Sequence, residues 1–148
     1  MKAEQVRRDT RREARPAIRL LARLSRVAET AFHEAGISLP QYRLLVLLDA
    51  GGRRAGEVAA DLGVTRPTLS SLVDGLERNG LLRRVPVASD RRGVRLESTR
   101  AGREALERAE RQLGERLGPL VEPAQAELAS DLVSSVCKAL DRQAVTPR

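Results

Sequence analysis

The chain has 148 residues, of which 41% are hydrophobic, so its length suits one domain with one core. Its 27 Lys and Arg against 20 Asp and Glu give a net charge of +7 and a pI near 11.0, which favours a polyanionic partner, with nucleic acid the leading candidate. No apolar run approaches the roughly eighteen residues of a membrane-spanning helix, so we expect no membrane role. No secretory signal is recognisable, and the lone Cys137 excludes an intrachain disulfide. We therefore expect a cytoplasmic protein.

A long helix is predicted near the N-terminus. Apolar residues recur at spacings of three and four from Ala17 to Phe32, which places them on one stripe of a helix that ends near Gly36. An arginine-rich arm precedes this stripe. A solvated end is the simpler interpretation of the arm, and contact with flanking DNA phosphates is the alternative. Under the simpler interpretation, removing residues 1–12 leaves DNA affinity nearly intact.

Three short helices are predicted next, over residues 40–48, 57–62 and 65–79. Gly63 breaks the second of them, and the hydroxyl of Thr65 suits the N-cap of the third. Since only a few residues separate the last two helices, they must cross at a tight turn.

The residues around this turn meet the geometric demands of a helix-turn-helix unit. Ala59 is small enough for the second helix to approach, and Gly63 tolerates the positive φ that the turn requires. The shared core of the two helices is expected to consist of Leu62, Val64, Leu69 and Leu72.

The helix that begins at Thr65 is the predicted recognition helix. At 100° per residue, Leu69, Val73 and Leu76 share a buried face, so the opposite face is small and polar. Small hydroxyl side chains near a helix N-terminus permit close entry into the major groove of DNA. An ordinary solvated face, or a protein-docking face, is the alternative. The DNA-binding candidates on this helix are Thr65, Arg66, Pro67, Thr68, Ser70, Ser71 and Arg78.

A β-hairpin is predicted from strands at residues 82–86 and 94–98, with Val94 and Leu96 facing inward and Arg95 and Glu97 outward. The hairpin is rich in arginine, and arginines on a projecting loop can enter the narrow minor groove of DNA. A solvated run of charges is the alternative. The candidate DNA contacts here are Arg84, Arg91 and Arg92.

Two more helices complete the chain, one capped by Thr99 and, after a break at Gly118 and Pro119, one over residues 128–140. The central unit is too small to cover the apolar stripes of the long terminal helices, so we predict a twofold dimer through residues of roughly 10–35 and 100–143. The predicted fold is mainly α with a small β-hairpin wing. Residues 37–99 form a winged helix-turn-helix DNA-binding lobe, and residues 1–36 and 100–148 form dimerisation helices, in one integrated domain.

Catalytic and metal-binding signatures are missing from the sequence. It contains no HExxH, CxxC pair, phosphate-cradling glycine loop or GxSxG, and its only His and only Cys, His33 and Cys137, are far apart. We therefore expect neither an enzyme nor a metal or cofactor. Redox sensing through Cys137 is an alternative, although we expect this residue to be a buried, small apolar side chain.

The segment EVAADLGVTRPTLSSLVDGLERNGLLRRVPVASDRRGVRLEST, residues 57–99, together with the order of elements, resembles the MarR family of bacterial transcriptional regulators. The most specific matches are LVDGLERNGLL, the triplet Asp90, Arg91 and Arg92, and Thr99 with Gly102. The resemblance implies a homodimer that binds a pseudo-palindromic operator in double-stranded DNA, usually represses nearby genes, and is often released by a small aromatic or anionic effector. A non-specific DNA-binding or protein-docking module is the alternative.

The resemblance also implies roles for individual residues. Arg92 corresponds to a wing arginine that enters the minor groove, Asp90 shapes the wing loop, and Asp74 pairs with a wing arginine so that the wing is fixed against the helix. Ser71 stands where many relatives have an arginine, and Ser98 replaces the usual leucine. We therefore expect the wing to contribute more of the affinity than in those relatives.

Family members bind effectors between the dimerisation helices and the DNA-binding lobe. This position places Phe32, His33, Tyr42 and Arg43 at a possible ligand pocket. They include the only Phe, His and Tyr of the chain. A core or subunit contact is the alternative for these residues.

Overall fold

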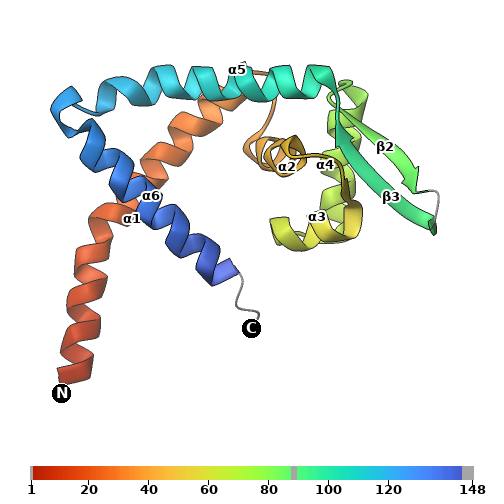
Figure 1. The fold of residues 1–148 in the computed structure, drawn as a ribbon. Helices are drawn as coiled ribbons and strands as arrows, with labels where there is room; N and C mark the ends of the chain where they lie inside the picture. The colour runs from red at the N-terminus through yellow and green to blue at the C-terminus, as the bar shows by residue number, and fades with distance from the viewer. Residues whose placement is uncertain (1, 88–89, 145–148) are drawn as a thin grey trace. The chain divides into compact units, whose positions relative to one another are not determined.

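The computed structural model describes the backbone of residues 2–87 and 90–144, and the side chains of residues 15–87, 93–140 and 142. The chain divides into two compact units, Met1–Leu113 and Gly114–Arg148. Figure 1 shows mainly helices and one small sheet. The elements are α1 (Lys2–Glu34), α2 (Leu39–Asp49), β1 (Arg53–Arg54), α3 (Ala55–Leu62), α4 (Arg66–Arg78), β2 (Leu82–Val87), β3 (Asp90–Ser98), α5 (Arg100–Leu117), the 3-10 turns η1 (Gly118–Leu120) and η2 (Pro123–Gln125), and α6 (Ala126–Ala144).

Helix α1 extends further toward the N-terminus than its apolar stripe predicts, because it includes the arginine-rich arm from Lys2 onward. Arg, Glu, Gln and Ala are good helix formers, so the arm continues the helix without an apolar stripe of its own. The helix ends near the predicted position, where Gly36 adopts a φ of +83°. Such a positive φ is available to glycine at little cost.

A capping box starts helix α2. The backbone N–H of Ser38 donates to Oε1 of Gln41 at 2.9 Å, and the N–H of Gln41 donates to Oγ of Ser38 at 3.4 Å. Pro40 lies in the first turn, where its missing N–H is not needed. Leu44 and Leu48 then bury one side of the helix in the core.

The helix-turn-helix prediction is confirmed. Gly63 ends α3 in the left-handed conformation with a φ of +64°, and the N–H of Val64 donates to the carbonyl of Ala59 at 3.1 Å. Thr65 caps α4 by accepting the N–H of Thr68 at 3.3 Å. The orientation of α4 is thus fixed by its own N-cap and by the short turn that precedes it.

Strands β2 and β3 form the predicted hairpin, somewhat longer than expected, in an antiparallel register that runs from Leu82 opposite Ser98 to Pro86 opposite Val94. Figure 1 shows this hairpin projecting beyond α3 and α4 as a wing. Leu96 faces inward with 1% exposure, as the alternating pattern predicts.

Strand β1 is absent from the predicted elements, because two residues are too short to show a period. Arg53 pairs with Leu96 and Arg54 with Arg95, so the sheet order is β1-β3-β2. Gly52 permits this pairing: a Cβ there would lie 2.5 Å from Cγ of Glu97 and 3.0 Å from the carbonyl oxygen of Leu96. A larger residue would push β1 away from the wing.

One hydrophobic core joins α1, α2, α3, α4, the sheet and the first half of α5. Helix α5 contributes small residues on one face, which allows it to lie close to its neighbours. The buried members of this core are Phe32, Ala35, Ile37, Leu44, Leu45, Leu48, Val58, Ala59, Leu62, Leu69, Val73, Leu76, Leu82, Leu96, Ala105, Leu106 and Ala109.

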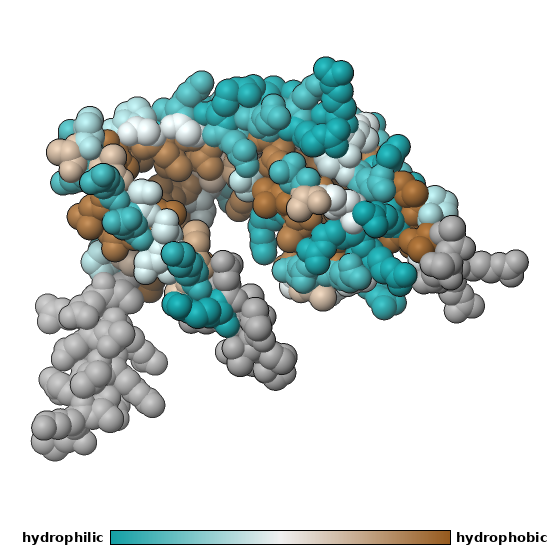
Figure 2. Space-filling model, viewed as in Figure 1, coloured by the Kyte–Doolittle hydropathy of each residue, from teal (hydrophilic) through white to brown (hydrophobic). Residues whose placement is uncertain are grey.

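The second unit consists mainly of α6, whose large apolar side chains are exposed. Figure 2 shows hydrophobic residues at the surface over this helix. Cys137 is also exposed, which corrects the expectation of a buried side chain: no described residue of α6 is buried, so the helix has no core of its own around the thiol. Among the described residues, no helix is long and apolar enough to span a membrane. The exposed large apolar residues of α6 are Leu128, Leu132, Val133, Val136 and Leu140.

Candidate nucleic-acid interface

Helix α4 presents the polar face that its sequence predicts. Leu69, Val73 and Leu76 are at most 4% exposed and anchor the helix in the core. The opposite face is open to solvent and consists of the exposed residues Pro67, Thr68, Ser70, Ser71, Asp74 and Arg78, with Thr65 and Arg66 at its N-terminal end. A helix held in this way offers short polar side chains on a rigid support.

Several of these side chains are already engaged within the helix. Oγ1 of Thr65 lies 2.8 Å from Oγ1 of Thr68, the hydroxyl of Ser71 donates to the carbonyl of Pro67 at 3.2 Å, and Nε of Arg78 donates to the carbonyl of Asp74 at 3.3 Å. These local bonds orient the side chains before any ligand binds. Arg66 and Ser70 have no such bond among the described residues.

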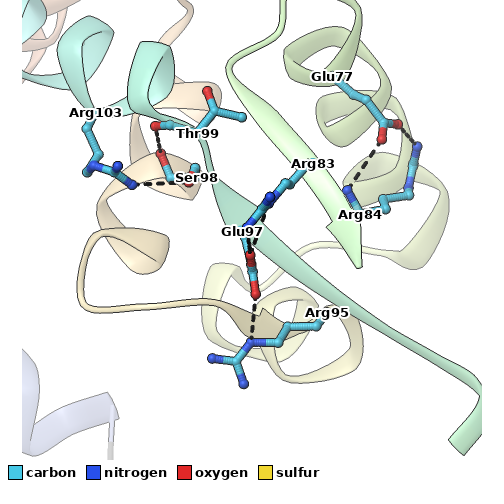
Figure 3. Close-up of polar contacts among 8 residues, drawn as sticks. All are labelled: Glu77, Arg83, Arg84, Arg95, Glu97, Ser98, Thr99 and Arg103. Atoms are coloured by element: carbon cyan, nitrogen blue, oxygen red, sulfur yellow. Dashed lines mark hydrogen bonds and ion pairs between the residues drawn. The ribbon is translucent and has the colours of Figure 1, made fainter. Parts of the chain in front are cut away.

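A clamp built on Arg84 joins the wing to α4. Arg84 lies on β2, and its Nη2 contacts Oδ1 of Asp74 at 2.6 Å, while its Nη1 contacts Oε2 of Glu77. The backbone N–H of Arg84 also donates to Oε1 of Glu77 at 3.4 Å. Figure 3 shows the contacts between Arg84 and Glu77. The hydrogen bond with Asp74 is the main reason that the pKa of Arg84 is raised above its usual value.

The clamp changes the role expected of Arg84, from a contact with DNA to a contact within the protein. Asp74 does face a wing arginine, and in this structure that arginine is Arg84. Both carboxylates of the clamp come from α4, so the side chain of Arg84 is directed at protein groups. Glu77 is absent from the predicted set, because its role depends on a strand that is near only in the folded chain.

A second ion-pair group lies elsewhere on the wing. Glu97 on β3 contacts Nη2 of Arg83 at 2.7 Å and Nε of Arg95 at 3.4 Å (Figure 3). Three of the hairpin arginines are therefore partly neutralised by carboxylates. The predictions for Asp90, Arg91 and Arg92 fall on side chains outside the described residues, and only the backbone of β3 is described there.

A hollow of about 640 Å³ separates the wing from α4 and the start of α3. Arg66 and Ser70 from α4 line it, together with Arg84 from the wing. Arg54 also reaches this hollow from β1, and it is absent from the predicted set because β1 has no periodic signal. Arg66 is the lining side chain best placed to meet an anionic surface between helix and wing, because Arg84 is held by two carboxylates and Glu57 adds a negative charge to the lining.

The predicted pocket residues separate into two groups. Phe32 and Tyr42 stack with ring centroids 4.3 Å apart and planes inclined by 14°, and Phe32 is buried. The hydroxyl of Tyr42 donates to Oε1 of Glu110 at 3.3 Å, so the pair links α1, α2 and α5. Burial, followed by the nearby Glu110 carboxylate, raises the pKa of Tyr42 above 10.0. His33 and Arg43 are exposed.

A second hollow, of about 700 Å³, lies where α1 meets the start of α2. His33 lines it together with Glu29 and Gln41, whereas Phe32, Tyr42 and Arg43 do not. The structure therefore joins the two aromatic rings to each other and leaves His33 at a separate opening. Among the described side chains, no group of three or more His, Cys, Asp and Glu is placed to hold a metal ion.

Comparison with known families and proteins finds similarity to transcriptional regulators. Residues 35–93 match the model of the MarR family. The chain is 44% identical over 66 residues to an uncharacterised HTH-type transcriptional regulator of Mycobacterium tuberculosis. The aligned segment covers 43% of this chain and 42% of the relative. It is 34% identical over 88 residues to the HTH-type transcriptional repressor YetL of Bacillus subtilis, covering 57% and 53% respectively. The matched segment thus spans about half the length of these relatives.

Solved structures match over most of the chain. The transcriptional repressor CouR bound to a 23-mer DNA duplex has a TM-score of 0.68 at 28% identity, and the match covers 82% of this chain and 89% of CouR. NadR in complex with 4-hydroxyphenylacetate has a TM-score of 0.74 at 22% identity, with coverage of 89% and 92%. The likeness to NadR concerns the fold.

Proposed function

We propose that this chain, a MarR-family winged-helix protein by virtue of its residues 35–93, is a homodimeric, sequence-specific repressor of transcription. The observation that carries the proposal is the clamp of Arg84 on Asp74 and Glu77, because it holds the wing and the exposed face of α4 as one rigid surface. YetL and CouR are both named as transcriptional repressors, and CouR is similar in structure while bound to DNA. Neither is named as an enzyme.

In this proposal α4 reads the major groove. Arg66, Thr68 and Ser70 lie at its exposed N-terminal part, where short side chains let the backbone approach base edges. Arg66 supplies a bidentate donor for guanine or phosphate. With Ser71 bonded to its own helix, the base contacts come mainly from the first turn and a half of α4.

The wing supplies a second anchor. Arg91 and Arg92 follow directly from the start of β3 and enter the adjacent minor groove, where the negative potential is high. Arg84 acts as a positioning residue in this arrangement, because the carboxylates of α4 hold its guanidinium. Phosphate contacts then fix the register while the base contacts specify the sequence.

Two copies of the chain bind the operator. The support is the run of exposed apolar residues on α6, with Leu132 and Val136 at 59% and 56% exposure, and Leu20 and Leu21 on α1. Soluble monomers seldom leave such continuous apolar faces in water. A twofold dimer would cover them and present two copies of α4 to a pseudo-palindromic site.

A small aromatic or anionic effector is proposed to release the repressor. The support is the NadR structure with 4-hydroxyphenylacetate and the hollow beside His33 on α1. Binding of 4-hydroxyphenylacetate and related phenolic acids can be screened by thermal shift, with His33→Ala and Tyr42→Phe as variants. A shift in the unfolding temperature that His33→Ala abolishes supports the site at this hollow.

Redox sensing through Cys137 is the competing form of regulation, because its thiol is exposed. We expect no effect of peroxide on DNA binding, because Cys137 belongs to α6 and not to the elements proposed to contact DNA. DNA affinity should be the same before and after peroxide treatment, and the same in Cys137→Ser. Loss of affinity in the wild type alone would favour redox sensing.

The decisive experiment measures binding to the DNA upstream of the protein's own gene at two salt concentrations. A repressor should prefer one duplex over competitor DNA by about 10³-fold or more, with a steep decrease in affinity as salt rises. Equal binding to all duplexes would contradict sequence-specific regulation and would favour a non-specific DNA-binding module.

A further inference from the structure

Thr99 connects the end of α4 to the start of α5. Its hydroxyl donates to the carbonyl oxygen of Gly80 at 2.7 Å and accepts the N–H of Gly102 at 3.0 Å. Its own N–H donates to the carbonyl oxygen of Leu81 at 3.1 Å. Since Gly80 and Leu81 lie in the turn after α4, one residue joins this turn to the first turn of α5.

Gly102 brings the two segments into direct contact. A Cβ at this position would lie 2.0 Å from the carbonyl oxygen of Leu81 and 2.6 Å from Oγ of Ser98, so only glycine fits. The backbone of α5 therefore lies directly on the turn after α4. A flexible loop could not maintain such a close approach.

Two further contacts strengthen the junction. Nη1 of Arg103 donates to the carbonyl oxygen of Ser98 at 3.2 Å, and the Ser98 hydroxyl donates to the carbonyl oxygen of Thr99 at 3.3 Å, as Figure 3 shows. On the other side of the turn, the N–H of Leu81 donates to the carbonyl of Leu76 at 2.9 Å. A continuous series of hydrogen bonds thus runs from α4 into α5.

We propose that Thr99 and Gly102 are positioning residues that fix α4 to α5, so that α5 sets the separation of operator half-sites that the dimer accepts. This inference rests on the proposed dimeric DNA-binding function. Each added base pair moves a half-site by about 3.4 Å and rotates it by roughly 35° around the duplex. A dimer with a rigid junction should bind duplexes of altered spacing weakly, whereas a dimer with a loose junction should bind them nearly as well.

The test first selects a preferred duplex from a random pool with the wild-type protein. Duplexes whose half-sites are one or two base pairs closer or further apart are then compared by fluorescence anisotropy, together with a single half-site. Thr99→Val removes the hydroxyl at nearly constant volume. We expect it to reduce the preference for the optimal spacing by at least about two- to tenfold, which is the usual effect of one hydrogen bond, since this hydroxyl makes two.

Two variants serve as controls in the same assay. Thr99→Ser retains the hydroxyl and should restore the spacing preference. Arg100→Ala removes only the neighbouring exposed pair with Glu104 and should leave the preference unchanged. Affinity for the single half-site should stay within about twofold in all three variants, because the face of α4 is untouched.

Each outcome has a distinct meaning. An unchanged spacing preference in Thr99→Val, or an equal loss at every spacing, overturns the inference while leaving the proposed function intact. If the wild type selects no preferred duplex, the proposed function itself fails.

Hydrogen exchange on the wild-type protein provides a test that needs no variant. We expect the amides of Thr99 and Gly102 to exchange together with those of the last turn of α4, because the segments open as one unit. Much faster exchange at the start of α5 than at the end of α4 would overturn the rigid junction.

Discussion

The lobe formed by the helix-turn-helix and the wing, residues 37–99, differs from helix α6 in the exposure of its large apolar side chains. In the lobe, Leu44 and Leu76 are fully buried in a core that α1 and α5 complete. In α6, Leu128 and Val133 each remain 63% exposed. Helices α4 and α6 are both amphipathic, so the apolar pattern alone does not account for the difference. A pattern of apolar residues requires a partner surface but does not say whether the same chain provides it.

The largest expected effect tests the α6 side of this comparison. The double change Leu132→Asp and Val136→Asp places charges on the exposed apolar face, which affects four side chains in a twofold dimer. With about 1.5–3 kcal/mol for each buried side chain, the dimer dissociation constant should rise by at least about 10³-fold. Sedimentation equilibrium measures this change.

The matched control for that experiment is Ser134→Asp, an exposed residue on another face of α6, which should leave the dimer intact. Circular dichroism should show a folded lobe in the double variant, because the buried core consists of residues between Phe32 and Ala109. A protein that is monomeric before any substitution contradicts the interpretation of α6.

The next largest effect concerns the wing. Arg92→Ala should weaken operator binding by about 1–3 kcal/mol if this residue makes a groove contact. Anisotropy titrations at constant salt give the dissociation constants. Lys2→Ala is the comparison, and a larger loss from Lys2→Ala than from Arg92→Ala would count against the role of the wing.

The clamp on Arg84 should have a somewhat smaller effect. Arg84→Met removes the guanidinium that lies between the wing and α4, so Asp74 and Glu77 repel the DNA and the wing loses its anchor. We expect an affinity loss of about tenfold, consistent with a partly exposed charge pair. Arg83→Met, which loses only its contact with Glu97, should change the affinity by less than about threefold.

A triple variant separates repulsion from positioning. Adding Asp74→Asn and Glu77→Gln to Arg84→Met removes the negative charges without restoring the anchor. Full recovery of affinity would mean that Arg84 acts only by neutralising charge. Partial recovery is the expected result for a positioning residue.

The smallest effect concerns stability in the lobe. Because the pKa of Tyr42 is raised on folding, its contribution to stability is present below pH 10.0 and is lost as the pH rises through the folded-state pKa. Tyr42→Phe keeps the stacked ring and should lower the free energy of unfolding at neutral pH by about 1 kcal/mol. Urea titrations between pH 7 and pH 11 should therefore show a smaller difference between the two proteins at high pH.

This titration has a simple spectroscopic check. Tyr42 is the only tyrosine in the chain, so its ultraviolet absorbance reports its ionisation directly. Ionisation at the ordinary tyrosine pKa would show that the burial of Tyr42 and its contact with Glu110 are both absent in solution.

Several features followed from the sequence because their causes are local. The turn at Gly63, the cap at Thr65 and the buried face of Leu69, Val73 and Leu76 depend on neighbours within a few residues. Backbone conformation, capping and a period of 3.6 residues determine them. The inward face of β3 was similarly accessible, since Leu96 alternates with charged residues along the strand.

Other features required the tertiary structure, because the sequence offers several equivalent partners. The hairpin contains many arginines, and only the folded arrangement places Arg84 against Asp74 and Glu77. Strand β1 becomes visible only through its pairing with β3, and Tyr42 meets Glu110 across 68 residues. Local physical chemistry thus determined the helices, the turn and the exposed polar face of α4. Long-range packing alone decided which charges are paired, because Coulomb attraction depends on distance in space and not on separation along the chain.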